Sequence, residues 1–325
     1  MYSTILIGFE NTEQGRDALE LGRVIARTTG GRLLVATVDP PATGFLGSRE
    51  QGAETRRASQ RLASQVLSHL PGLGLALEAR CVAASSPASG LRHLAEAEGA
   101  DVIVVGSTHR GALGRILPGS VGERLLTGSP CAVAVAPRGY AEARARRRLG
   151  AKPSTNGTVG ADDPQPRVIG VGFDGSAQGE EALLVAARLA TRARAALRVI
   201  AVAPSHPLGL RSAQPEVHAA AVQLYLDLQD RLQDAVAELP GDLRPQAIFL
   251  RGDPASVLLS MAAQGVDLLV IGSRGKHGPV HRVLLGSVSQ AVMHRAPCPV
   301  LITPRTARAP LSVSEGVSNA VSAMS

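Results

Sequence analysis

Two glycine-rich stretches of this chain have the residue types and the spacing that suit binding of a phosphate group. The first runs from Gly106 to Ser120 and the second from Gly272 to Ser287. Glycine lets backbone amides come close to phosphate oxygens, and a helix beginning at either serine would point its free N–H groups and positive dipole end at the same place. Positive charge within the stretches comes from Arg110, Arg115, Lys276 and Arg282. The pattern predicts an anion-binding turn in each half of the chain.

The same residues also have interpretations that involve no ligand. Ser120 with Glu123, and Ser287 with Gln290, match the spacing of a capping box, so we expect both serines to cap helices in addition to any phosphate contact. The glycines alone could make a turn from strand to helix. A metal site is not expected, because Gly278-Pro279 interrupts any helix that would align His277 with His281.

The whole sequence repeats itself, and the glycine-rich stretches are part of that repeat. Residues 5–12 return as residues 169–176, with Gly8 matching Gly172. Further segments return at offsets of 166 or 167 residues: Pro87-Ala88-Ser89, Asp101 to Ser107, Gly119-Ser120-Val121 and Pro130-Cys131. Two copies of one domain that diverge at their loops produce this pattern. We therefore expect domains at 1–137 and 167–304, a basic linker with proline and glycine at 138–166, and a disordered tail at 305–325.

Short β-branched runs alternate with longer helical patterns in each copy, which predicts two tandem α/β domains with doubly wound parallel sheets of the Rossmann-like type. In the first copy, strands are expected near 4–9, 32–38, 75–83, 101–106 and 131–136, and helices near 13–29, 51–69, 88–98 and 119–127. The runs 102–105 and 268–271 are apolar throughout, as central strands covered on both faces would be. Such sheets bind ligands beyond the carboxyl ends of their strands, where both glycine-rich stretches begin.

Composition narrows the classes of protein to which the chain can belong. Hydrophobic residues make up 45% of the 325 residues and charged residues 19%, which is typical of a globular protein. The chain has neither the roughly 18 consecutive apolar residues of a membrane span nor the layout of a signal peptide, so we expect a cytoplasmic protein with no membrane partner. Three widely spaced cysteines argue against a disulfide framework or a zinc site and predict buried thiols: Cys81, Cys131 and Cys298.

The basic charge of the chain is unevenly distributed. The net charge is +7, and residues 138–166 alone contribute +3 of it. Aromatic residues make up only 2% of the chain, so few side chains are present on which nucleic-acid bases could stack. We therefore interpret the linker as a solvated basic tether, within which 141–149 could form a short helix, and do not expect nucleic acid as a partner.

The glycine spacing and the strand that follows it resemble the tandem universal stress protein (UspA-like) family. Nucleotide-binding members carry Gly-x2-Gly-x9-Gly-Ser/Thr after strand four, then a helix and a Pro-Cys-Pro-Val strand. That strand reads Pro297-Cys298-Pro299-Val300 here, and Pro130-Cys131-Ala132-Val133 in the first copy. The resemblance covers about 1–137 and 167–304 and implies an adenine nucleotide alpha hydrolase-like fold. It also implies a pseudo-twofold pair of domains joined through their fifth strands. It does not decide whether two chains also form a homodimer.

The resemblance implies ATP or AMP as the ligand, with Mg²⁺ only as a companion of the bound nucleotide. In the family, an acidic residue after strand one and a valine after strand two lie on the adenosine side, and the glycines with the Gly-Ser pair hold ribose and phosphates. The site carried over to the second copy comprises Asp174, Val202, Gly272, Arg274, Gly275, Gly278, Gly286, Ser287 and Val288. A weaker site in the first copy comprises Glu10, Val38, Gly106, His109, Gly111, Gly119, Ser120 and Val121. Asp174 or Ser176 could instead cap a helix.

Both copies depart from the family motif, in different ways. In the first copy His109 replaces the second glycine, which puts a Cβ where the backbone would approach phosphate. In the second copy ten residues instead of nine separate Gly275 from Gly286. The second copy keeps the family's strand-one ending, Asp174-Gly175-Ser176, whereas the first has Glu10-Asn11-Thr12. The second copy is therefore the better candidate for nucleotide binding.

The resemblance favours a stress-response protein that binds adenine nucleotide and acts as a regulator or sensor without efficient catalysis. A slow ATPase or nucleotidyl transferase is the enzymatic alternative. The chain lacks a Walker A lysine, a Ser-Gly-Gly-x-Asp-Ser loop and a base placed to activate water, so no catalytic residue is expected. A third hypothesis is an interaction scaffold without nucleotide, which the two departures from the motif would suit.

Overall fold

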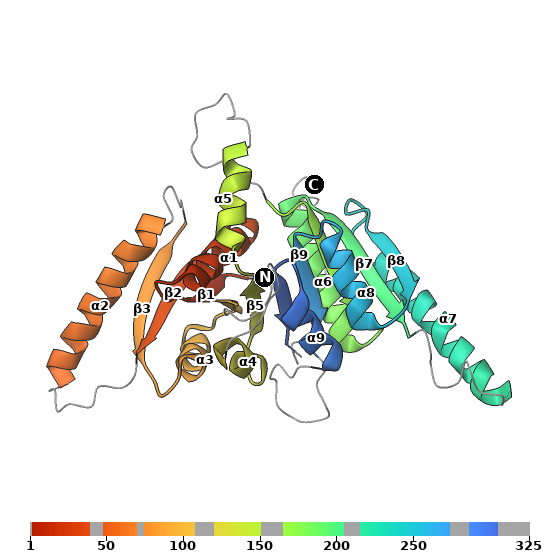
Figure 1. The fold of residues 1–325 in the computed structure, drawn as a ribbon, viewed down its shortest axis with the longest axis horizontal. Helices are drawn as coiled ribbons and strands as arrows, with labels where there is room; N and C mark the ends of the chain where they lie inside the picture. The colour runs from red at the N-terminus through yellow and green to blue at the C-terminus, as the bar shows by residue number, and fades with distance from the viewer. Residues whose placement is uncertain are drawn as a thin grey trace, which may run out of the picture.

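The structure is a computed structural model of the chain and describes residues 2–39, 48–69, 75–107, 120–150, 165–204, 215–273 and 286–304. Two α/β halves follow one another in it, joined by a helix between them (Figure 1). The predicted tail, 305–325, and part of the predicted linker lie outside the described residues.

In the first half, strands and helices alternate as the sequence predicts. The elements are β1 (Thr4–Gly8), α1 (Glu13–Thr29), β2 (Arg32–Asp39), α2 (Ser48–His69), β3 (Leu77–Ala83), α3 (Pro87–Glu98), β4 (Val102–Gly106), α4 (Ser120–Leu126) and β5 (Ala132–Ala136). Local signals set the ends of α1, because the Thr12 side chain accepts a hydrogen bond from the Gly15 amide and Gly30 ends the helix at a φ of 74°. The predicted elements of this copy are confirmed to within a few residues.

The second half repeats this order. Its elements are β6 (Val168–Phe173), α6 (Ala177–Ala193), β7 (Ala196–Ala203), α7 (Pro215–Ala237), β8 (Gln246–Arg251), α8 (Pro254–Ala263), β9 (Leu268–Gly272), α9 (Ser287–Arg295) and β10 (Val300–Thr303). The side chains of Ser176 and Asp253 cap α6 and α8 at their N-termini. The repeat found in the sequence is thus a repeat of the fold.

The described strands form one ten-stranded sheet in the order β3-β2-β1-β4-β5-β10-β9-β6-β7-β8. Strands are parallel within each half, and the halves meet where β10 runs antiparallel to β5, with Ile302 opposite Val133. In each half the second strand lies on one side of the first strand and the fourth strand lies on the other: β1 pairs with β2 and β4, and β6 pairs with β7 and β9. The predicted doubly wound α/β fold is therefore confirmed. The order reverses between β1 and β4, and between β6 and β9, where such sheets form their ligand crevice.

Helices cover both faces of the sheet, and each face has its own apolar core (Figure 1). Helices α1, α2, α6 and α7 contribute to one core, and α3, α4, α8 and α9 to the other. Strand β4 serves both, since Val102 and Val104 face the first core whereas Ile103 and Val105 face the second. The prediction that the central strands are buried on both faces is confirmed.

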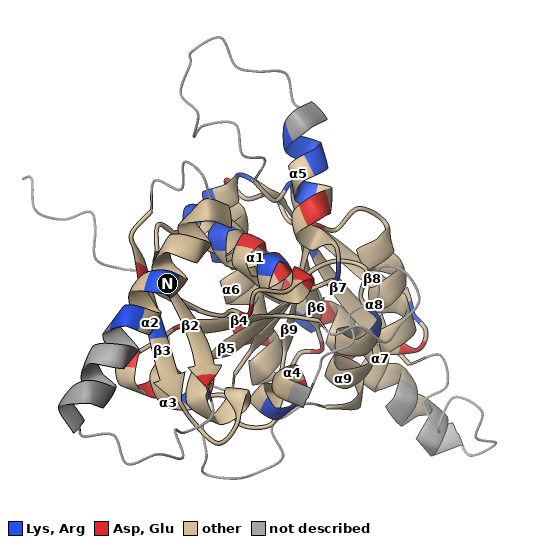
Figure 2. Ribbon diagram, turned by 60° about the vertical axis from the view of Figure 1, so that its left-hand side comes forward, with Lys and Arg blue, Asp and Glu red and all other residues tan. Residues whose placement is uncertain are grey.

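Helix α5 (Tyr140–Gly150) confirms the helix predicted in the linker, but the expectation of a solvated tether is wrong for this part. Figure 2 shows α5 beside α1. The buried Asp17 carboxylate on α1 accepts hydrogen bonds from the amides at the start of α5, Gly139 at 2.9 Å and Ala141 at 2.8 Å. Glu20 on α1 pairs with Arg144, which is only 5% exposed. The basic residues predicted to be solvated are therefore partly used to dock the helix.

Helix α5 also contacts the second half of the chain. Arg147 donates to an Asp267 carboxylate oxygen at 2.9 Å, and the other oxygen of Asp267 accepts from the Arg167 amide at the start of β6. Burial of the Asp17 side chain raises its pKa to about 6, against the lowering effect of the two amide hydrogen bonds. Helix α5 is thus docked on α1 through the buried Asp17 and reaches the second half through the more exposed ion pair of Arg147 with Asp267.

Two of the predicted buried thiols are buried, and the third is not. Cys131 and Cys298 lie just before β5 and β10, and burial raises the pKa of each thiol to about 12. Cys81 in β3 is half-buried, with its sulfur 3.2 Å from the Thr37 hydroxyl. Its outer-strand position explains the difference, because β3 is an edge of the sheet.

A helix that spans a bilayer needs about 20 consecutive, mostly apolar residues. Over the residues that the structure describes, no helix is long and apolar enough to cross a membrane.

Candidate functional site

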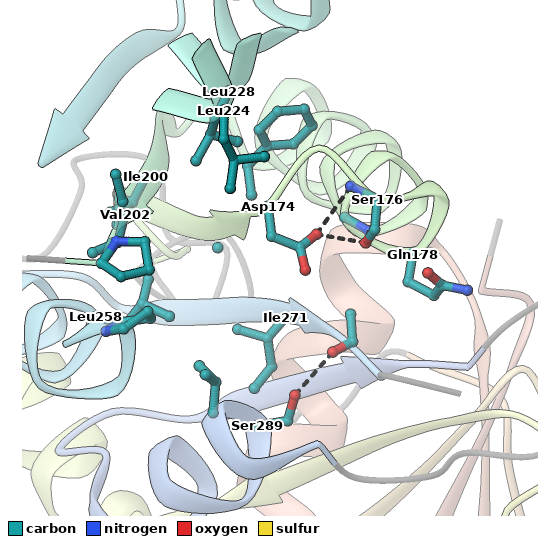
Figure 3. A pocket seen from close by; sticks show the side chains of 18 of the residues that line it. Asp174, Ser176, Gln178, Ile200, Val202, Leu224, Leu228, Leu258, Ile271 and Ser289 are labelled. Carbon is teal, nitrogen blue, oxygen red and sulfur yellow. Dashed lines mark hydrogen bonds between the residues drawn. The ribbon is translucent and has the colours of Figure 1, made fainter. Parts of the chain in front are cut away.

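A cavity of about 300 Å³ lies beyond the carboxyl ends of β6 and β9, at the point where the strand order of the second half reverses. Figure 3 shows its residues, with Asp174 near Ser176 on one side and Ile271 and Ser289 on another. Strands β6, β7 and β9, the first turn of α6, and α7, α8 and α9 all contribute to its lining. The cavity is thus built from segments that are far apart in the sequence.

Asp174 marks the polar end of the cavity, directly after β6. Its Oδ1 accepts a hydrogen bond from the Ser176 amide at 3.1 Å and another from the Ser176 hydroxyl. Ser176 in turn accepts from the Gly179 amide at 3.1 Å and caps α6. Ser176, and not Asp174, therefore caps α6. The hydrogen bonds from Ser176 orient the Asp174 carboxylate.

The beginning of α9 forms another wall, and here the capping-box prediction is wrong for Ser287. The N-cap residue is Gly286, which has no side chain, and within the described part of the chain no side-chain hydrogen bond caps the helix. Ser287 is already within α9. The Ser289 hydroxyl instead donates to the Gly272 carbonyl at 3.0 Å, which ties α9 to the end of β9 (Figure 3). Since the cap residue itself supplies no acceptor, the first amides of α9 suit donation to an anion.

Gly272 and its counterpart Gly106 have a packing role that the sequence did not disclose. A Cβ at Gly272 would lie 2.6 Å from the Gln178 carbonyl oxygen, and one at Gly106 would lie 2.2 Å from that of Gln14. Both carbonyls belong to the first turn of the helix that follows the first strand of their domain. Glycine is needed at these strand ends because the helix backbone passes too close for any side chain.

The remaining walls of the cavity are apolar. Val202 of β7 lines it together with Leu258 of α8, and Leu224 and Leu228 of α7 lie on the far side from Ser289 (Figure 3). A polar end next to an apolar chamber suits a ligand that has a flat apolar part and an anionic or hydroxyl-rich part.

A second cavity, of about 240 Å³, occupies the same place in the first half. Glu10, Val38, Gly106 and Val121 line it, so the residues predicted there do come together. Thr12, rather than Glu10, caps the adjoining helix α1. The cavity has smaller side chains than its counterpart at three matching positions, where Ala36, Val105 and Gly122 stand in place of Ile200, Ile271 and Ser289.

The predicted site residues divide into four groups, of which Glu10, Val38, Gly106 and Val121 line the cavity of the first half. Asp174, Val202, Gly272 and Val288 line the cavity of the second half. Gly286 and Ser287 begin α9 beside the cavity without lining it. Outside the described residues lie Arg274, Gly275, Gly278, His109, Gly111 and Gly119, and nothing is described of the Ser120 side chain.

Some lining residues were missed by sequence reasoning. Ser289 lies one residue beyond the Gly-Ser-Val segment, and its partner is a backbone carbonyl 17 residues away. Leu224, Tyr225 and Leu228 belong to α7, which the motif does not include.

Over the described residues, no group of three or more His, Cys, Asp or Glu side chains could hold a metal ion.

The sequence matches the family model of the universal stress protein family over residues 1–137 and 166–304. A universal stress protein of Mycobacterium tuberculosis is 28% identical over 315 residues, which cover 93% of this chain and 99% of that protein. Another from the same species is 33% identical over 205 residues, which cover 62% of this chain and 61% of the relative, so that match spans less than two thirds of the relative's length.

Solved structures show the same fold. A universal stress protein from Archaeoglobus fulgidus has a TM-score of 0.61 at 20% identity, covering 93% of this chain and 98% of the other. A putative universal stress protein from Pseudomonas aeruginosa has a TM-score of 0.59 at 17% identity, covering 93% and 94%. With both copies matched by the family model, the chain belongs to the universal stress protein family and carries the family's domain twice.

Proposed function

We propose that the second domain binds an adenine nucleotide, ATP or AMP, in the cavity between β6 and β9, and that the protein acts as a regulator or sensor without efficient catalysis. The observation that carries the proposal is the arrangement of Asp174 on one side of the cavity and the glycine-capped start of α9 on another, with the apolar chamber between β7, α7 and α8 beside them. A carboxylate suits ribose hydroxyls, N-terminal helix amides suit phosphate oxygens, and apolar walls suit a purine.

The size of the cavity agrees with this ligand. Small-molecule sites enclose about 300–1,000 Å³, and the cavity of about 300 Å³ is at the lower end of that range. We propose that it encloses the nucleoside and that the phosphates extend toward α9 and the loop before it. Mg²⁺ would then arrive with the phosphates rather than at a preformed protein site.

Calorimetric titration with ATP and with AMP tests this proposal. Asp174→Asn should lower nucleotide affinity by about 10- to 150-fold, since a hydrogen bond to a charged group is worth about 1.5–3 kcal/mol. The matched variant Glu10→Gln, in the first domain, should leave this affinity within about twofold. Absence of saturable binding to the wild-type protein below millimolar nucleotide would remove the ligand from the proposal.

We also propose that the two domains form a pseudo-twofold pair about an axis between β5 and β10. The antiparallel pairing of these strands, and a strand order that reads the same from either edge, support this relation. Whether two chains assemble further into a homodimer can be measured by sedimentation.

A further inference from the structure

We propose that α7 forms a base-selective wall of the cavity, in which Tyr225 selects a purine and Arg251 and Arg231 hold the wall in place. The inference rests on the proposed nucleotide binding and adds to it a determinant of base preference outside the glycine motif. It also predicts that the two domains differ in the ligand that they prefer.

Tyr225 is an aromatic lining residue in a chain with very few aromatic side chains, and two side chains of β8 fix its ring. The Arg251 guanidinium carbon lies 4.3 Å from the ring centroid, and its Nε donates a hydrogen bond to the tyrosine hydroxyl. Phe249 meets the ring edge-on, with the centroids 4.9 Å apart and the planes at 80°. A ring held in this way loses little freedom when a ligand arrives, so its contact with the ligand costs little entropy.

A second contact ties α7 to the polar end of the cavity. Arg231 Nη1 donates to the Gly175 carbonyl at 2.8 Å. Gly175 has a φ of 70° and directly follows Asp174, so the turn that carries the carboxylate is held by the same helix that carries Tyr225. Arg231 is thus a positioning residue that sets the spacing between the tyrosine and the carboxylate.

The wall has apolar surface for a ligand to cover. Leu224 lines the cavity and is nevertheless 65% exposed, and the half-buried Leu228 lies one turn further along α7. An aromatic ring with aliphatic neighbours favours a flat, π-rich ligand, and a purine covers more of it than a pyrimidine. The chemistry of this wall therefore selects the base, whereas Asp174 and α9 act on the sugar and phosphates.

The first domain lacks these contacts within its described part. With α2 and α7 aligned on their buried leucines, Leu62 and Leu232, the sequence has Thr55 where α7 has Tyr225. The strand registers place Cys81 and Ala83 where β8 has Phe249 and Arg251. Arg61, the counterpart of Arg231, donates instead to the Arg57 carbonyl of its own helix at 3.4 Å.

Titration of ATP, CTP and inorganic tripolyphosphate separates base recognition from phosphate recognition. Tyr225→Leu should lower ATP affinity about tenfold, because a stacked base is worth about 1–3 kcal/mol. It should also bring the ratio of ATP to CTP affinity near one, with tripolyphosphate binding unchanged. Tyr225→Phe keeps the ring and should stay within about threefold of the wild type. Arg231→Ala should weaken ATP binding, whereas the matched Arg61→Ala should not.

The outcomes distinguish this inference from the proposed function. Tyr225→Leu protein that prefers ATP over CTP as strongly as the wild type does overturns the base-selective wall and leaves nucleotide binding intact. Equal losses for ATP and tripolyphosphate, with a lower melting temperature, assign Tyr225 a structural role only and also overturn it. Wild-type protein that binds no ATP removes both proposals.

Discussion

Replacing Gly272 with alanine tests whether this motif glycine is required for packing of helix against strand. The new Cβ would lie 2.6 Å from the Gln178 carbonyl oxygen, whereas ordinary contacts begin at 3.4 Å. The obstacle is backbone and cannot rotate away, so β9 and α6 must separate by about 1 Å or distort, and overpacking of this kind costs about 1–3 kcal/mol. At about 3 °C per kcal/mol, the melting temperature should fall by roughly 3–9 °C.

A matched control is Gly170→Ala in β6 of the same domain. The three atoms nearest to its Cβ would be side-chain atoms, with Val266 Cγ1 at 3.1 Å, and side chains can adjust more easily than backbone. We expect this variant to lose less than about 1 kcal/mol. Thermal and urea unfolding of both variants measure the difference, and a Gly272→Ala protein no less stable than Gly170→Ala would refute the packing argument.

The same variant also reports on the ligand. Gly272 and Gln178 both line the cavity, so separating them should weaken ATP binding together with stability. A Gly272→Ala protein with unchanged stability but no ATP binding would show that the glycine serves the approach of the ligand instead.

Three further predictions concern groups outside the cavity. For Asp17 the raised pKa means that the folded state holds the proton more tightly, so its stability contribution is present below about pH 4 and is lost as pH rises through about 6. Asp17→Asn should remove that dependence from urea unfolding curves recorded between pH 4 and 8. Glu20→Gln removes the carboxylate that pairs with the buried guanidinium groups of Arg23 and Arg144 and should cost about 3 kcal/mol in the same assay. Because burial raises their thiol pKa to about 12, Cys131 and Cys298 should not react with a disulfide reagent at pH 8 in the native state, whereas Cys81 should react first.

Much of the fold could be predicted because its signals are local. Caps such as Thr12 and Ser176, apolar runs such as 102–105, and the recurrence of both at a near-constant offset depend only on neighbouring residues. The carboxyl ends of β1 and β6 follow from the same signals, so the sequence also placed Glu10 and Asp174 at the mouths of the two crevices.

Errors arose where a residue had a choice of partner. Ser287 has the spacing of a capping box, yet α9 begins with Gly286 as its cap, and Ser289 bonds to the end of β9. The arginines near 144–148 look solvated by composition, but α1 presents Glu20 to Arg144 and Arg148. Both outcomes depend on which carboxylate or carbonyl another element brings near, and spacing along one segment contains no such information.

The sequence by itself determined that this protein is one α/β domain used twice, and it located a carboxylate and a helix start at each crevice. Only the tertiary structure decided how those crevices are finished. Helix α7 reaches the cavity through contacts of Tyr225 with Arg251 and of Arg231 with Gly175, across 26 and 56 residues. Helix α5 joins the domains through Arg147 and Asp267, 120 residues apart. The physical reason is that periodicity and capping are properties of adjacent residues, whereas a cavity wall or an interdomain ion pair exists only after the sheet has brought distant side chains together.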